Sequence, residues 1–126
     1  MKVTLLGTGT STGIPTIGVK RESCLSSDKR DNRLRSSILI EYKSKSILID
    51  CGPDFRQQML RINKTKIDAI FFTHEHADHT AGLDDIRPIS FHHGKIPIYA
   101  HKRVVDNLKN RFDYLFDKKG DYPGSP

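Results

Sequence analysis

Residues 67–80 read IDAIFFTHEHADHT, an apolar run of strand length followed at once by three histidines and two acids within six positions. Half of the six histidines of the chain lie here, which composition alone does not explain. In extended chain, His74 and His76 point to the same side. Asp78 and His79 are neighbours and converge only if the chain bends, as it would at a helix opening near His79. The stretch therefore predicts four ligand-type side chains at a strand end, where α/β sheets usually hold their ligands.

The side chains of this cluster have the chemistry of a metal site. Imidazole nitrogen with carboxylate oxygen suits Zn²⁺ or, with open positions, Mn²⁺ or Fe²⁺. A helix-borne HExxH protease site is excluded, because position 78, four after His74, is an aspartate. The glycine-rich loop after the first strand runs G-x-G-x-x-x-G and continues into Pro15, which does not match a dinucleotide-binding loop. A solvated loop with incidental histidines is the remaining alternative.

The rest of the chain predicts strands and helices in alternation. Residues 14–35 are polar and without a period, and are interpreted as one long loop, a feature that is usually functional or mobile. Hydrophobic spacing predicts strands at 2–6, 67–72 and 96–100, a hairpin over 36–49, and helices at 54–62, from 80 to an end or kink at Pro88, and over 102–116. Residues 117–126 are rich in helix breakers. This order predicts an α/β domain with a mixed sheet.

Length and composition narrow the class further. A chain of 126 residues is about one small domain. No stretch approaches the roughly eighteen apolar residues of a membrane span, so no membrane contact is expected. Cys24 and Cys51 are interpreted as free thiols, and with no signal-peptide core in the first residues the expected location is cytoplasmic. The formal net charge of +6 favours anionic partners.

Several stretches of the sequence resemble the metallo-β-lactamase-fold hydrolases. They are LLGTGTSTGIP at 5–15, LIDCGPDFRQQ at 48–58, and THEHADHTAGLDDIRP at 73–88 with its H-x-H-x-D-H pattern. The resemblance runs along essentially the whole chain, and it is to the branch that holds the phosphonate-pathway cyclic phosphodiesterase and the tRNA 3′-processing nuclease. It implies a fold: the N-terminal αβ half of an αββα sandwich.

The resemblance also implies a ligand set. His74 and His76 would bind one metal ion, and Asp78 and His79 a second. Asp50 would be an outer residue that orients the site, although an aspartate at a strand end can equally cap the turn 50–53. Glu75 is expected to point away from the two histidines by alternation. Asp84 and Asp85 are expected on a helix surface or at a helix cap.

The activity that this resemblance implies is that of a metal-dependent phosphodiesterase. Two divalent ions about 3.5–4 Å apart can hold a bridging hydroxide, polarise a phosphoryl oxygen and stabilise the leaving oxygen. Asp78 is assigned to this catalytic step, zinc is the expected metal, and a small cyclic or linear phosphate ester is the expected substrate. The alternatives are an RNase Z-like nuclease acting on RNA, a thioester or lactam hydrolase on the same fold, and a non-catalytic half-domain.

The nuclease alternative depends on a basic loop that could follow a phosphate backbone, with an affinity that falls as salt rises. Its cations are Lys20, Arg21, Lys29, Arg30, Arg33 and Arg35, against Glu22, Asp28 and Asp31. A solvated charged loop explains the same residues equally well.

The sequence also departs from the family. A cysteine cluster that holds an extra structural zinc in close relatives is replaced by Val19, Arg21 and Cys24, so no third zinc site is expected. The later family ligands, two histidines and a bridging aspartate, match nothing here: His92, His93 and His101 are not in ligand positions, and 91–95 is interpreted as an exposed turn. The prediction is a single partial domain over 1–126, inactive or nearly so alone, that self-associates or needs a C-terminal half.

Overall fold

The core of the computed structural model, which describes residues 1–116, is one five-stranded sheet in the order β1-β2-β3-β4-β5. The strands are β1 (Lys2–Gly7), β2 (Ser37–Tyr42), β3 (Lys45–Ile49), β4 (Ala69–Phe71) and β5 (Ile98–Tyr99). β1, β2 and β3 pair antiparallel, whereas β3, β4 and β5 pair parallel. The predicted mixed α/β sheet and the hairpin over 36–49 are confirmed.

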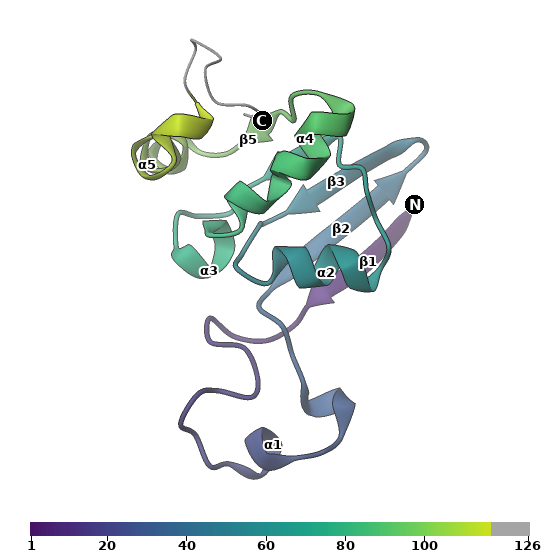
Figure 1. The fold of residues 1–126 in the computed structure, drawn as a ribbon, viewed down its shortest axis with the longest axis vertical. Helices are drawn as coiled ribbons and strands as arrows, with labels where there is room; N and C mark the ends of the chain where they lie inside the picture. Colours follow the sequence, from purple (N-terminus) through teal and green to yellow (C-terminus); the bar gives the residue numbers. More distant parts are fainter. Residues whose placement is uncertain (117–126) are drawn as a thin grey trace.

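Helices lie between and after the strands, and those predicted near 54–62 and 102–116 are among them. They are α1 (Glu22–Leu25), α2 (Phe55–Arg61), α3 (Ala77–Thr80), α4 (Arg87–His93) and α5 (Lys102–Arg111), with 3₁₀ turns η1 (Lys29–Asp31), η2 (Leu83–Ile86) and η3 (Asp113–Leu115). In Figure 1, α2 and α4 lie over the same face of the sheet. Their buried side chains, with those of α5, pack on the fully buried Leu39, Leu48 and Ile70 of the three central strands.

The opposite face of the sheet is also apolar but is not covered in the same way. Directly opposed residues of paired strands share a face, which places two rows here: Val3, Ile40, Ile47 and Ala69, and Leu5, Ile38, Ile49, Phe71 and Tyr99. Val3, Leu5, Phe71 and Tyr99 are 40–58% exposed, and the rings of Phe71 and Tyr99 stack with centroids 4.7 Å apart. We call this set the open face.

Two predictions about local structure are wrong. Pro88 does not end a helix: it lies in the first turn of α4, where a residue without an N–H is tolerated. The segment before it breaks instead at Gly82, between α3 and η2. Residues 91–93, predicted as an exposed turn, are the exposed last turn of α4, which ends at Gly94 with a positive φ of 82°.

The loop 14–35 is more structured than a featureless polar segment. It contains α1 and η1, and isolated bridges join Gly9 to Arg35 and Ile14 to Arg33. Figure 1 shows it extending away from the sheet and helices. Its predicted mobility stays a prediction.

In residues 1–116, no helix has the length and apolar character that crossing a membrane requires. Both cysteines are free thiols. The cytoplasmic location stays a prediction, and the breaker-rich stretch 117–126 lies outside the described residues.

Candidate metal centre

The predicted ligands lie together just beyond the carboxyl end of β4. The ring centroids of His74 and His76 are 4.6 Å apart, and those of His74 and His79 are 4.0 Å apart. Nε2 of His79 is 3.2 Å from a carboxylate oxygen of Asp78. The bend that brings Asp78 and His79 toward the other two ligands is α3, which begins at Ala77, two residues before the predicted helix opening near His79. The side chains His74, His76, Asp78 and His79 therefore form one cluster, which we call the ligand cluster.

The backbone beneath this cluster is held by the turn that follows β3. The amide of Cys51 donates to the carbonyl of His79 (2.8 Å), and the amide of Gly82 donates to the carbonyl of Cys51 (2.9 Å). A Cβ on Gly52 would lie 2.1 Å from the carbonyl oxygen of Asp78, and one on Gly82 would lie 2.0 Å from that of Gly52. Two chain segments can approach this closely only because both residues are glycine.

Asp50 is the buried centre of the hydrogen bonds around the cluster. Its carboxylate accepts from the amide of Thr73 (2.8 Å), from the Thr73 hydroxyl (2.8 Å) and from Nδ1 of His79 (2.8 Å). Its φ of 60° is in the left-handed region, which costs a non-glycine residue about 1–2 kcal/mol. Strained backbone persists where surrounding contacts fix it and is concentrated at functional sites. The carboxylate reaches away from the turn 50–53, so capping that turn is not its role.

These hydrogen bonds assign the tautomers of two histidines. His79 donates from Nδ1 to the carboxylate of Asp50, so Nε2 is the nitrogen that faces Asp78. The single proton of the Thr73 hydroxyl goes to Asp50, so its contact with Nδ1 of His74 (3.0 Å) must be accepted from that nitrogen. His74 therefore also presents Nε2. A ligand histidine is usually fixed in this manner, with the other ring nitrogen donating to a carboxylate or a similar group.

The donor atoms of the cluster are of the types that divalent metal ions bind, but they are arranged in two pairs. Nε2 of His79 and a carboxylate oxygen of Asp78 lie 3.2 Å apart. Two lone pairs this close repel each other unless a proton or a cation lies between them. However, within residues 1–116 no three His, Cys, Asp or Glu side chains are placed to hold one ion. Zinc sites usually use three or four protein ligands. Within the described residues, the cluster alone therefore falls short of such a site.

The other candidates lie outside the cluster. The carboxylate of Glu75 points to Arg103 of α5, and a hydrogen bond from its own amide, with Arg103 and His76 nearby, lowers its pKa. Asp84 accepts from the hydroxyl of Tyr114, and Asp85 is exposed. His92, His93 and His101 are exposed, and Nδ1 of His101 accepts from the amide of Arg103 as the N-cap of α5.

The two cysteines are also separate from the ligand pairs. Cys51 is fully buried behind Asp50, and burial raises the pKa of its thiol well above the usual value of 9.0. Cys24 lies in α1 and is partly buried.

Sequence reasoning missed the residues that support the cluster. Thr73 joins Asp50 to His74, and the hydroxyl of Thr80 donates to the carbonyl of His76 (2.9 Å). Arg111 donates to Thr80 and to the carbonyl of Glu75 from another helix. Threonines beside ligands are visible in the sequence, but no spacing signal points to an arginine 36 residues away from Glu75.

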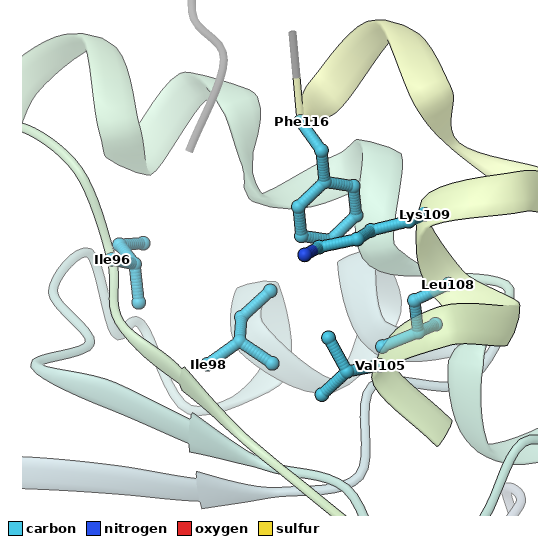
Figure 2. A pocket seen from close by; sticks show the side chains of 6 residues that line it. All are labelled: Ile96, Ile98, Val105, Leu108, Lys109 and Phe116. Atoms are coloured by element: carbon cyan, nitrogen blue, oxygen red, sulfur yellow. The ribbon is translucent and has the colours of Figure 1, made fainter. Parts of the chain in front are cut away.

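An apolar pocket of about 250 Å³ beside α5 is not this site. Figure 2 shows its lining: Ile96, Ile98, Val105, Leu108, Lys109 and Phe116. It contains one charged side chain and none of the predicted ligands, so it offers no chemistry for hydrolysis.

Comparison with known proteins places this chain in a family. A family model described as the β-lactamase superfamily domain matches residues 45–124. A Porphyromonas gingivalis protein named octanoyltransferase is 47% identical over 127 residues, which cover 100% of this chain and 25% of that protein. Ribonuclease Z of Methanococcus aeolicus is 31% identical over 115 residues, covering 87% of this chain and 31% of that enzyme.

Two solved structures resemble this chain over most of its length. A diphosphatase of the PhnP family is 50% identical with a TM-score of 0.86, over 90% of this chain and 46% of that one. The short form of human tRNase Z is 27% identical with a TM-score of 0.66, over 94% of this chain and 42% of that one. The chain thus spans from a quarter to about half the length of these relatives. Because the family model matches more than half of it, the chain belongs to the β-lactamase superfamily, as a hydrolase-type metallo-β-lactamase fold of the branch that includes ribonuclease Z.

Proposed function

We propose that this chain supplies ligands to a metal-dependent phosphodiesterase, with His74 and His76 on one ion and Asp78 and His79 on a second. The observation that carries the proposal is the orientation of the ligand histidines. Asp50 fixes the ring of His79 directly and the ring of His74 through Thr73. Both contacts use Nδ1, so Nε2 is the nitrogen left for a metal ion. An incidental histidine-rich loop would not need a buried carboxylate that sets two ring orientations at once.

The residues of the chain would have different roles in this reaction. Bound divalent ions, zinc first and manganese or iron as alternatives, would supply Lewis-acid chemistry and an activated water. His74, His76, Asp78 and His79 hold the ions, and Asp50 keeps the proton of His79 on Nδ1, away from the ion. Asp78, partly exposed, is the carboxylate available to the reacting groups.

The substrate class is proposed from the neighbours. A diphosphatase and ribonucleases both cleave a phosphorus–oxygen bond, and these relatives match this chain over most of its length. RNA is the alternative phosphodiester. Arg30 is paired with Asp28 and Arg35 with Asp54, while Lys20, Arg21 and Lys29 are exposed and available to a phosphate backbone.

A second candidate is hydrolysis of an acyl thioester. The relative of Porphyromonas gingivalis is named for acyl transfer, although only a quarter of that protein matches this chain.

We further propose that a second β-layer covers the open face and completes the metal coordination. The strands are apolar on both faces, a pattern typical of strands buried on both sides. The row containing Ile49 and Phe71 lies next to the ligand cluster, since Asp50 and Thr73 follow those strands. A covering layer would therefore bring its own ligands beside the two pairs. It can come from another segment or from a second chain.

The experiment is metal analysis of the purified protein, together with hydrolysis of a generic phosphodiester, RNA and a thioester, with His76→Ala as control. Metal binding and phosphodiester turnover that are both lost in His76→Ala support the proposal. Bound metal with turnover of the thioester alone would replace it by the second candidate. RNA cleavage that weakens steeply with salt would assign the substrate to RNA. Absence of metal would leave a non-catalytic interaction domain.

A further inference from the structure

Helix α5 holds the segment that carries the ligands at two points. Nη1 of Arg111 donates to the carbonyl oxygen of Glu75 (3.1 Å) and to the hydroxyl of Thr80 (2.9 Å). The Thr80 hydroxyl is fully buried and donates its proton to the carbonyl oxygen of His76 (2.9 Å). Nearer the start of the helix, Nη2 of Arg103 donates to the carboxylate of Glu75 (3.2 Å).

The segment needs such support because it has little structure of its own. Between β4 and η2 the only regular element is α3, with four residues. A helix of one turn is not stable in isolation, since forming its first turn orders several residues for one hydrogen bond. His76 and Ala77 are exposed, so packing does not fix them. The direction of the His76 ring therefore depends on hydrogen bonds to the backbone around it.

We propose that Arg111 is a positioning residue for metal binding. One guanidinium nitrogen holds the carbonyl of Glu75 on one side of His76 and, through Thr80, the carbonyl of His76 itself. It thereby keeps the imidazole of His76 beside that of His74. Arg111 does not join the ligand set; it acts through the backbone. The inference rests on the proposed function, because it concerns the same ligands.

Arg103 has a lesser part in the same contact. Its side chain is 71% exposed, and it pairs with the carboxylate of Glu75. Exposed ion pairs add little to stability. Arg111 instead donates to a buried hydroxyl and a backbone carbonyl, groups that would each lose a partner on its removal.

The test compares three variants of the full chain: Arg111→Met, Arg111→Lys, and Lys109→Met as matched control. Lys109 is a basic residue of α5 that lines the apolar pocket of Figure 2 and belongs to none of the contacts above. The first readout is the ring ¹⁵N spectrum of His74 and His76 in metal-free protein. We expect one sharp set of signals in the parent and in Lys109→Met, broadened or doubled His76 signals in Arg111→Met, and recovery in Arg111→Lys.

The second readout is the affinity for zinc. Loss of an outer residue that orients ligands typically reduces metal affinity by about 10–100-fold, so we expect Arg111→Met to fall in that range and Arg111→Lys to recover most of it. Parent-like ring spectra in Arg111→Met would overturn the inference. Changed spectra in a series where even the parent binds no zinc would keep the positioning role but refute the proposed function. If Arg111→Met does not fold, Arg111→Gln takes its place in both readouts, with the same expected result and the same overturning result.

Discussion

The two faces of the sheet both carry apolar side chains but have different surroundings. On one face Leu39, Leu48 and Ile70 are fully buried beneath the helices. On the open face Leu5 and Tyr99 remain at least half exposed. Burial, not composition, decides what an apolar side chain contributes, at roughly 25 cal/mol per Å² removed from water. The covered face therefore holds this part of the chain together, and the open face is the surface available to a partner layer.

The largest expected effect is the difference in unfolding free energy between a leucine-to-alanine substitution on the covered face and one on the open face. Leu48→Ala removes a fully buried side chain and should lower the free energy of unfolding by about 2–5 kcal/mol. Leu5→Ala, at a 58% exposed position, should change it by less than about 0.5 kcal/mol. Urea denaturation of both variants measures the difference. Equal losses would mean that the open face is covered in solution, and a loss for Leu5→Ala that grows with protein concentration would identify a second copy as the cover.

A second prediction concerns the turn that joins the covered face to the ligand cluster. Gly52→Ala places a methyl group 2.1 Å from the carbonyl oxygen of Asp78, so the two segments must separate. We expect a loss of about 1–3 kcal/mol in unfolding free energy, as for overpacking, and a weaker zinc affinity. Gly94→Ala is the control, because nothing lies within 4 Å of its added Cβ and only its positive φ is strained. Unchanged zinc affinity in a destabilised Gly52→Ala would show that the turn does not position the cluster.

The third prediction tests the relay from Asp50 to His74. Thr73→Val keeps the shape but removes the hydroxyl that accepts from Nδ1 of His74. We expect zinc affinity to fall by about tenfold, the lower end of the effect of such outer residues. Thr73→Ser should retain the affinity of the parent. Calorimetric titration with zinc measures both, and equal affinities for Val and Ser would contradict the relay.

The smallest effect lies at the opposite end of the sheet. Burial raises the pKa of Asp68, but the amide of Ser46 and the ammonium groups of Lys45 and Lys66 together hold it below the usual 3.8. A carboxyl whose pKa is lower in the folded state stabilises fully above its unfolded pKa and loses that contribution as pH falls through its folded pKa.

Asp68→Asn should therefore cost less than about 1 kcal/mol at neutral pH, since both lysines are largely exposed. The difference from the parent should shrink as pH falls below about 4. Melting temperatures between pH 3 and pH 7 measure it. A difference that is constant across this range would exclude the carboxylate as its cause.

The parts predicted from the sequence are those fixed by local spacing. The alternation of His74 and His76, the bend at α3 and the hairpin of β2 and β3 all depend on residues a few positions apart. Strand-length apolar runs predict the sheet but not which face lacks a cover, because both faces carry apolar side chains. That distinction appears only in the burial of Leu48 against Leu5.

What could not be predicted depends on contacts between distant segments. The helix predicted from 80 to Pro88 is wrong because the chain breaks at Gly82, where it packs closely on Gly52, and this tertiary contact has no signal in local spacing. For the same reason, neither the role of Arg111 nor the left-handed backbone of Asp50 is predictable from sequence spacing. The sequence predicts one charged surface for the basic loop, whereas in the structure Arg35 pairs with Asp54 and donates to the carbonyl of Ser11.

The central claim is that the ligand cluster binds divalent metal through His76 and its neighbours. Titration of zinc into the parent, His76→Ala and His92→Ala tests it most directly, because His92 is an exposed histidine of the same chain outside the cluster. We predict binding in the parent, the same affinity in His92→Ala, and a loss of at least about tenfold in His76→Ala. Equal zinc binding in all three proteins would contradict the claim.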